Sequence, residues 1–299
     1  MRVAVIINPV AGGPNRATAR DRRDAARAWL EARTIRGDVE LTTGHGHAAD
    51  LARAYVRDGV DRVIAWGGDG TANEVAGPLI GTTAVLGLVP AGSGDGLARS
   101  IGLPADPAEA LAVAVGDRTM RLDVGWLGDR HFLNVGGFGF DAAVARAFEH
   151  DVRRGPAGYV RAGLRCLRSY RAAPCTVDLD GAVLAGAWFL VAFANGREYG
   201  NGFVLAPDGD PCDGLLDVVV VETGSRLRQL WRARSLLLKK TLPVDGVRRH
   251  RARRAVVSSA AGLVAHVDGE PFAPGSPVAV RVDAGAIRLA VAPTPRAGG

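Results

Sequence analysis

One glycine-rich loop decides the fold of this chain: Ala65-Trp66-Gly67-Gly68-Asp69-Gly70-Thr71-Ala72-Asn73-Glu74-Val75. A β-rich run at 62–66 leads into the loop, and a helical run at 71–79 follows it. Glycines let a backbone approach a phosphate closely, and Asp69 supplies a carboxylate for Mg²⁺ or for a proton. The alternative is that Asp69 or Thr71 only caps the helix. The loop predicts a phosphate-binding strand–turn–helix unit.

Two further loops repeat this arrangement. Asn8-Pro9-Val10-Ala11-Gly12-Gly13 follows a predicted strand at 2–7, and Val89-Pro90-Ala91-Gly92-Ser93-Gly94-Asp95-Gly96 ends another at 84–89. Each loop alone is a weak signal. Turns that follow parallel strands gather at one edge of a sheet, where ligands of open α/β sheets bind. Three of them together predict a ligand site at that edge.

The order of predicted elements divides the chain into two domains. Residues 1–121 alternate strands (2–7, 38–41, 62–66, 84–89) with helices (15–33, 48–56, 71–79, 107–115), which predicts a three-layer α/β domain with a mostly parallel sheet. Residues 122–284 contain closely spaced β-like runs (130–135, 175–179, 187–194, 215–221, 255–259, 278–282) and two helical insertions (141–150, 225–240). This pattern predicts a C-terminal antiparallel β-sandwich domain. The segment 285–299 could return to the first domain.

Composition limits the class of protein. The 299 residues are 47% hydrophobic and 23% charged, as in ordinary globular proteins. Three cysteines without CxxC spacing argue against a disulfide framework or a thiolate zinc site. The longest apolar stretch falls short of the ~20 residues that cross a bilayer. We therefore predict a soluble, cytoplasmic protein.

Several nucleotide-binding classes are excluded. No G-x-x-x-x-G-K-[ST] motif occurs, and the two lysines, Lys239 and Lys240, lie far from the first domain, so neither a P-loop lysine nor a protein-kinase lysine is present. Residues 137–142 match a dinucleotide fingerprint, but no acid follows at the required distance. Amides, arginines and metal must therefore balance the phosphate charge.

The three loops together resemble the catalytic domain shared by diacylglycerol kinases, sphingosine kinases and soluble bacterial lipid kinases. The resemblance continues through the runs at 122–125, 132–142, 213–218 and 267–270 and covers about residues 2–292. It implies ATP-dependent transfer of a phosphate to a lipid hydroxyl, with ATP between the two domains and Mg²⁺ as the metal. It also implies these nucleotide-binding residues: Asn8, Pro9, Gly12, Thr43, Gly67, Gly68, Asp69, Gly70, Thr71, Gly92, Ser93 and Gly94.

The same resemblance assigns the carboxylates. Asp268 is the leading candidate for the base that accepts the hydroxyl proton, and Asp69 is the second choice. Glu270 and Asp123 would arrange metal and phosphates together with Asp69. Without the resemblance, Asp268 and Glu270 would be interpreted as part of a hairpin turn, because Asp-Gly is a common turn pair.

Other residues carry predictions about substrate and metal. Asp141 matches a position that contacts the lipid head, or it only caps a helix. Asp95 stands where relatives carry asparagine and adds a negative charge near the phosphate edge. Asp213, helped by Asp210, resembles a ligand of a structural Mg²⁺, although acidic glycine loops are usually only turns.

Basic residues raise the question of a membrane. The net charge is +6, all but two of the 37 basic residues are arginines, and residues 226–254 hold a cluster of them. A compositional bias, or a solvated helix face, explains this as well as peripheral contact with an anionic membrane does. No nucleic-acid motif is evident, and a homodimer stays open. Competing functions are a soluble-acceptor kinase of the NAD kinase type and an inactive lipid-binding protein.

Overall fold

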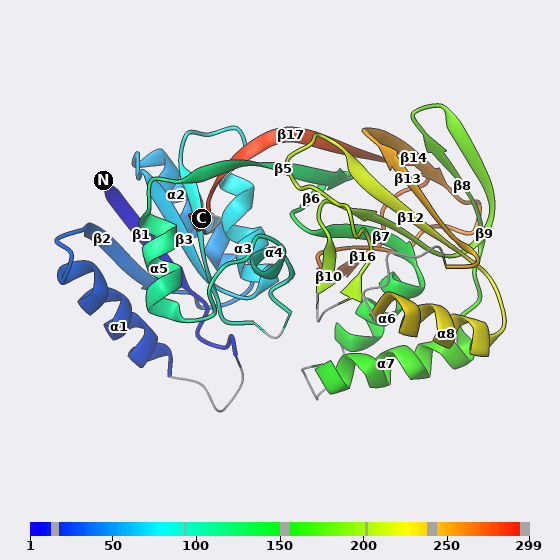
Figure 1. Ribbon diagram of the computed structural model, residues 1–299, viewed down its shortest axis with the longest axis horizontal. Coiled ribbons are helices and arrows are strands. Elements are labelled where there is room, and N and C mark those ends of the chain that lie inside the picture. The colour runs from blue at the N-terminus through cyan, green and yellow to red at the C-terminus, as the bar shows by residue number, and fades with distance from the viewer. Residues whose placement is uncertain (13–17, 93, 150–155, 201–202, 238–243, 294–299) are drawn as a thin grey trace, which may run out of the picture. The chain divides into compact units, whose positions relative to one another are not determined.

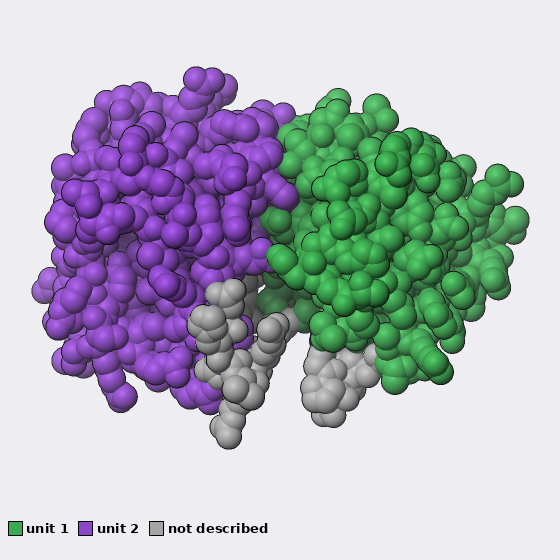
Figure 2. Space-filling view, turned by 180° about the vertical axis from the view of Figure 1, so that it is seen from behind, with its two compact units in different colours: residues 1–122, 285–299 green, residues 123–284 purple. Residues whose placement is uncertain are grey.

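The computed structural model describes residues 1–12, 18–92, 94–149, 156–200, 203–237 and 244–293. The chain divides into two compact units, which are Met1–Leu122 with Gly285–Gly299, and Asp123–Ala284 (Figures 1 and 2). We call them unit 1 and unit 2. Strands β5 (Thr119–Leu127) and β17 (Val278–Ala290) each contribute residues to both units.

Unit 1 contains a parallel sheet in the order β2-β1-β3-β4-β17. Its first four strands are β1 (Arg2–Ile7), β2 (Arg36–Leu41), β3 (Arg62–Gly67) and β4 (Val85–Pro90). Its helices are α1 (Ala19–Glu31), α2 (His47–Arg57), α3 (Asp69–Ala76), the 3₁₀ turn η1 (Gly77–Leu79), α4 (Gly96–Ser100) and α5 (Pro107–Val115). Residues of α1 and α5 pack against the sheet in one apolar cluster. The predicted α/β architecture is confirmed.

Local chemistry explains why these elements form where they do. Strands β1 and β3 are apolar runs buried on both faces, as strands of a covered parallel sheet must be. Thr18 and Asp21 form a capping box at the start of α1, and Asp106 caps α5 with Pro107 in its first turn. The helix predicted from residue 15 therefore begins at Ala19, and residues 13–17 lie outside the described part of the chain.

Unit 2 is a sandwich of two antiparallel sheets. One has the order β16-β15-β7-β9-β12-β13, and the other contains β6, β5, β17, β14, β8 and the beginning of β9. The strands are β6 (Arg130–Phe132), β7 (Val135–Gly139), β8 (Pro174–Leu179), β9 (Ala182–Ala194), β12 (Leu216–Glu222), β13 (Val247–Ala252), β14 (Arg254–Ser258), β15 (Ala265–Val267) and β16 (Glu270–Phe272), with a separate pair β10 (Glu198–Gly200) and β11 (Phe203–Val204). The helices are α6 (Phe140–Glu149), α7 (Pro156–Ser169) and α8 (Arg226–Leu237). The predicted sandwich is confirmed.

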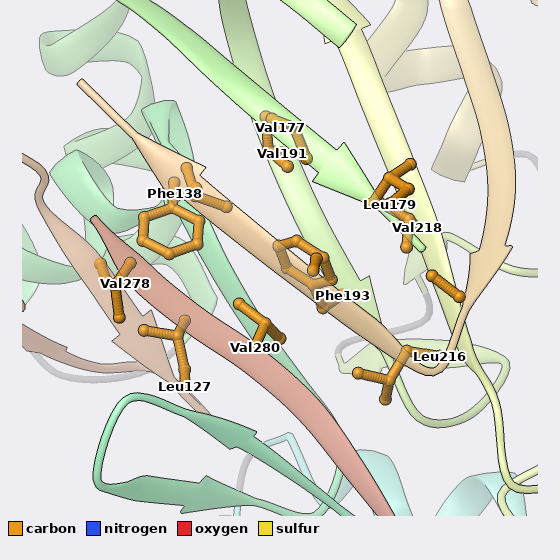
Figure 3. Packing of buried hydrophobic residues seen from close by; sticks show 14 of the residues in the cluster. Leu127, Phe138, Val177, Leu179, Val191, Phe193, Leu216, Val218, Val278 and Val280 are labelled. Atoms are coloured by element: carbon orange, nitrogen blue, oxygen red, sulfur yellow. The ribbon is translucent and has the colours of Figure 1, made fainter. Parts of the chain in front are cut away.

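The core of unit 2 lies between these sheets (Figure 3). Phe138 and Phe193 meet edge to face, with ring centroids 6.2 Å apart, among aliphatic side chains of both sheets. Such aromatic pairs add to the stabilisation from buried area. In the described part of the chain, no helix combines the length and the apolar character needed to span a bilayer.

One sequence prediction in unit 2 needs correction, and two elements were not predicted. The strand predicted at 130–135 is two strands, because the chain leaves one sheet after Phe132 and enters the other at Val135. Helix α7 was not predicted at all. The arginine-rich segment after α8, for which no element was predicted, forms β13, whose register with β12 pairs Arg251 with Asp217. These features depend on pairing across the fold, which local patterns do not reveal.

We predict that Gly125→Ala lowers the free energy of unfolding by about 1–3 kcal/mol. A β-carbon at Gly125 would stand 2.1 Å from the ring of Phe132, which is fully buried and also faces Gly136. Chemical denaturation monitored by circular dichroism measures the change. Gly163→Ala is the matched control: it lies in α7 with open space at its β-carbon, and we expect stability to be unchanged or raised. Equal losses in both variants would contradict the packing argument.

Candidate active site

The loops after the parallel strands of unit 1 meet at the carboxyl edge of its sheet. Asn8, directly after β1, donates from Nδ2 to the Thr71 hydroxyl at 3.0 Å, and its Oδ1 accepts the Val10 N–H at 3.1 Å. The first loop is thereby fixed to the start of α3. Gly12 has φ +91°, a left-handed conformation that favours glycine. Two predicted nucleotide-binding residues, Asn8 and Thr71, are therefore in direct contact.

Close backbone approach explains the glycines of the second and third loops. A β-carbon at Gly67 would lie 2.5 Å from the Thr71 hydroxyl oxygen, and one at Gly68 would lie 3.2 Å from the Gly92 Cα. The Ala91 N–H donates to the Gly67 carbonyl at 2.9 Å. These glycines thus serve the packing of loop on loop, before any ligand is considered. Ser93 lies outside the described residues.

Asp95 has a backbone role in the third loop. It adopts φ +47°, and its Oδ1 accepts the Gly92 N–H at 3.0 Å. Asparagine is also tolerated in this left-handed conformation and offers the same kind of acceptor oxygen. The aspartate found here therefore keeps the geometry of the turn and adds a negative charge.

Glu74 joins the loop after β2 to α3. Its carboxylate accepts the Ala48 N–H at 3.2 Å at the start of α2 and lies 3.1 Å from His45 Nδ1. His47 Nδ1 in turn accepts the Thr43 N–H at 3.0 Å. The two histidines therefore belong to the loop after β2 and to the start of α2. Sequence reasoning quoted Glu74 only as part of a motif and missed this contact.

A cavity of about 410 Å³ opens in unit 1 beside these loops. Arg22 lines it and is 5% exposed, and its guanidinium donates to the carbonyls of Asn8 (3.2 Å) and Ala11 (2.6 Å). Asp95 and the exposed Arg99 also line it. Arg22 therefore shapes the Asn8 loop from inside the domain, a contact that the sequence did not predict.

In unit 2, the turn that carries Asp268 holds the crossing between the two sheets. Asp268 Oδ2 accepts the Leu133 N–H at 2.8 Å, and Oδ1 accepts those of Asn134 (3.0 Å) and Val135 (2.9 Å). Asn195 donates to the Leu133 carbonyl at 2.9 Å, and its own N–H donates to that of Asn134 at 2.8 Å. The Asp268 N–H donates to the Val135 carbonyl at 2.8 Å. Every backbone polar group of 133–135 is thereby satisfied.

Asp268 and Gly269 form a two-residue hairpin turn, with φ +47° and +88°, between β15 and β16. The hairpin interpretation of this pair is therefore correct, and it places Glu270 at the first position of β16. Asp180 and Gly181 form the same turn between β8 and β9, and the Asp180 carboxylate likewise accepts two backbone N–H groups, at 2.8 and 3.1 Å. The catalytic role of Asp268 stays a prediction.

Asp141 has a buried partner. It is 5% exposed, and its Oδ2 lies 2.9 Å from Nε2 of His266, which is fully buried. The other ring nitrogen of His266 accepts the Gly269 N–H at 3.3 Å. His266 therefore connects Asp141 to the Asp268–Gly269 turn. The prediction that Asp141 contacts a lipid head stays a prediction, and His266 was missed, although it stands two residues before Asp268.

Asp123 is also a structural acceptor. It is 1% exposed, its Oδ2 accepts the Gly214 N–H at 2.6 Å, and its own N–H donates to the Pro211 carbonyl at 2.8 Å. The carboxylate thereby holds the 211–214 loop against β5. Its predicted role in arranging metal and phosphates stays a prediction.

The predicted magnesium site lies in this same loop. Asp210 and Asp213 accept N–H groups two residues ahead, and Asp213 Oδ2 lies 3.4 Å from the guanidinium of Arg251. Arg251 also bonds Asp217 at 3.1 Å. The Arg251 guanidinium therefore partly neutralises the carboxylates of Asp213 and Asp217. Among the described residues, no three His, Cys, Asp or Glu side chains group as a metal site, so the structural Mg²⁺ finds no support there and stays a prediction.

Desolvation and acidic neighbours raise the pKa of Cys212 in this loop and of Asp217 in β12. Desolvation raises the pKa of Cys212 to about 12, with Asp210, Asp123 and Asp213 adding to the effect. Desolvation also raises the pKa of Asp217, against the opposing hydrogen bond from Arg251. Cys212 is therefore a protonated thiol near neutral pH and a poor ligand or nucleophile.

Comparison with known proteins places this geometry in a family. The family model described as the diacylglycerol kinase catalytic domain matches residues 2–127, and the model described as the YegS C-terminal NAD kinase beta sandwich-like domain matches residues 134–291. The chain belongs to the diacylglycerol kinase family. Homologues bear the names of phosphotransferases.

Relatives in this family are similar over most of the chain. A diacylglycerol kinase of Mycobacterium tuberculosis is 32% identical over 90% of this chain and 88% of its own length. A probable lipid kinase YegS-like of Chromohalobacter salexigens is 35% identical, with 64% of each chain aligned. The crystal structure of a putative diacylglycerol kinase from Bacillus anthracis matches with a TM-score of 0.80 over 98% of both chains at 23% identity, which shows a shared fold.

The predicted site residues of this member of the diacylglycerol kinase family fall into three groups. Unit 1 brings together the loops of Asn8, Thr43, Gly67–Thr71 and Gly92 at one sheet edge, with Asp69 as the first residue of α3. Unit 2 brings together Asp268, Glu270 and Asp141 around His266. Asp123 lies near Asp213 and Asp210, which are the predicted metal ligands in unit 2.

We predict that Asp268→Asn lowers the free energy of unfolding by about 1–3 kcal/mol, because an amide cannot accept all three N–H groups and turns a donor toward one of them. Asp180→Asn is the matched control, since it removes acceptors from the same kind of turn outside the predicted site. Thermal unfolding at pH 7 measures both. If Asp268→Asn left stability unchanged while Asp180→Asn reduced it, the structural account of Asp268 would be wrong.

Proposed function

We propose that this chain is an ATP-dependent lipid kinase, which transfers the γ-phosphate of ATP to the hydroxyl of a lipid such as diacylglycerol or a sphingoid base. The observation that carries the proposal is the meeting of glycine loops with the amino terminus of α3 at the carboxyl edge of one parallel sheet. Membership of the diacylglycerol kinase family supports it. Contact with an anionic membrane surface, where such lipids reside, is part of the proposal.

Unit 1 would hold the nucleotide. Helix α3 begins at Asp69, its N-cap Gly68 provides no side-chain cap, and N–H groups at a helix start favour phosphate. The loop glycines keep side chains away from the backbone there. Phosphoryl transfer requires positioning and charge neutralisation more than covalent chemistry by the protein. Mg²⁺ enters with ATP as part of that substrate, and Asp69 is the carboxylate at the helix start that would face it.

Unit 2 would supply the base that receives the hydroxyl proton. Asp268 is held in one orientation by three backbone N–H groups, and His266 accepts the Gly269 N–H of the same turn. A fixed carboxylate suits a general base, which must meet the hydroxyl at one place. Glu270, across the same turn, would position phosphates or metal. Asp69 is the alternative base.

A soluble acceptor is the second candidate. The description of the model that matches residues 134–291 refers to NAD kinase, so phosphorylation of NAD must be tested beside that of lipids. An inactive lipid-binding protein is the third reading, in which no acceptor is labelled. One assay separates these three outcomes.

We expect the purified chain, incubated with radiolabelled ATP, Mg²⁺ and a total lipid extract, to label a lipid and not NAD. Asp69→Asn should reduce the rate by at least about 100-fold, because it removes the only carboxylate in the glycine loop at 67–71. Asp24→Asn, an exposed carboxylate on α1, is the control and should retain full activity. Labelling of NAD in place of lipid, or of neither, would overturn the proposal.

The activity of Asp268→Asn is compared with that of Asp180→Asn in the same assay, because both substitutions remove carboxylate contacts to backbone N–H groups in the same kind of turn. If Asp268 is the base, its variant loses at least about 100-fold in kcat under conditions where both proteins are folded, and the Asp180 variant does not. Equal activity of the two folded variants would assign the base to another residue.

A further inference from the structure

Helix α8 exposes apolar side chains to solvent and buries polar ones. Three apolar side chains in its first two turns point outward, with Leu227 79%, Leu230 43% and Trp231 52% exposed. Its polar residues Gln229 and Arg232 are buried instead, at 4% and 2% exposure. Leu227, Leu230 and Trp231 stand three or four residues apart and therefore share one face of the helix. An exposed apolar face of this kind marks a surface for interaction.

Polar contacts fix this orientation. Gln229 Nε2 and Arg232 Nη1 both donate to the Glu222 carbonyl, at 2.8 and 2.7 Å, and Arg232 Nε donates to the Asp245 carbonyl at 2.7 Å. A β-carbon at Gly246 would collide with the Arg232 guanidinium, so the glycine makes room for it. Because α8 is attached through its polar side, the apolar side cannot turn into the core without breaking these bonds.

Helix α7 continues the same surface. Its residues Arg161, Leu164, Arg165 and Arg168 are exposed and recur at helical spacing. The Arg226 guanidinium donates to the Arg168 carbonyl at 2.7 Å, which joins the start of α8 to the end of α7 (Figure 1). Neither helix contains an acidic residue. We call the exposed residues of the two helices, with Leu227, Leu230 and Trp231, the α7–α8 face.

Two arginines later in the basic segment differ. Arg248 pairs with Glu222, and Arg251 pairs with Asp217 and Asp213, so they already meet carboxylates within the sandwich. These two arginines therefore contribute less to the cationic surface predicted over 226–254, and α7 adds exposed arginines that the sequence did not indicate. Two helices without acidic residues, which carry exposed arginines beside exposed leucine and tryptophan, are complementary to a negatively charged surface with an apolar interior.

We propose that the α7–α8 face docks on an anionic lipid bilayer, with Leu227, Leu230 and Trp231 entering the acyl boundary and the arginines of both helices at the phosphate headgroups. This inference rests on the proposed function, because it supplies the surface through which a lipid kinase would reach an acceptor in a membrane. It concerns binding, however, and can be tested without catalysis.

The first test is flotation with vesicles of phosphatidylcholine, with and without 30% phosphatidylglycerol (roughly the anionic content of a charged leaflet), at low and high salt. We expect binding that requires the anionic lipid and weakens with salt. The triple variant Leu227→Ser, Leu230→Ser, Trp231→Ser should lose at least about 10-fold in affinity. The control is Val183→Ser with Val256→Ser, two exposed valines on β9 and β14, which should bind as the native chain does.

A second pair of variants tests charge. Arg161→Gln, Arg165→Gln and Arg168→Gln together should reduce binding to anionic vesicles, whereas Arg253→Gln with Arg254→Gln, exposed arginines of the sandwich, should not. Vesicles with brominated acyl chains should quench tryptophan fluorescence in the native chain and much less in Trp231→Phe. This measurement places Trp231 in the bilayer even where a multiple variant folds poorly.

The outcomes separate this inference from the proposed function. With a short-chain diacylglycerol dissolved in buffer, the triple variant should phosphorylate as the native chain does, and only its activity on vesicles should fall. Full kinase activity on vesicles by a variant that no longer floats would overturn the docking face alone. Vesicle binding that ignores lipid charge, or a triple variant that changes oligomeric state and not vesicle binding, would also overturn it.

Discussion

The crossing of the chain between two sheets at Leu133–Val135 is the constraint on which unit 2 depends. These residues are almost fully buried, and part of their backbone is no longer in one ladder and not yet in the next. Buried backbone groups without partners are costly. Asp268 and Asn195 supply the missing partners from positions more than 60 residues away in sequence. The turn that carries the leading candidate for the catalytic base therefore also stabilises the passage of the chain from one sheet to the other.

Unit 1 meets a related constraint by removing side chains. Its strands are fixed by apolar runs buried on both faces, and this brings the loops after β1, β3 and β4 to one edge. Loops so close together have no room for β-carbons at Gly67 and Gly92. Asn8 and Thr71 then connect the first loop to α3. The packing of loop against loop therefore requires glycine at these positions, and it leaves the backbone there without side chains.

Sequence was sufficient where a feature is local. The strand at 2–7 and the helix at 107–115 were predicted with the bounds that the structure has, because each combines an apolar pattern with clear terminal signals. The division of 130–135 into two strands was not predicted, because its cause is a carboxylate 133 to 135 residues away. His266 was missed for the same reason: its partner Asp141 is 125 residues distant. Helix α8 was predicted, but no pattern showed which of its sides is attached.

Carboxylates in this chain repeatedly do structural work that a motif alone does not distinguish from chemistry. Asp95, Asp123, Asp180 and Asp268 each accept backbone N–H groups at a turn or loop. The contact of Asp95 with the Gly92 N–H needs only an acceptor oxygen, which an asparagine would also supply. At Asp268, three N–H groups are accepted, and both oxygens are required. The negative charge at Asp268 therefore follows from the fold itself, whereas the contact of Asp95 with the Gly92 N–H does not require a charge.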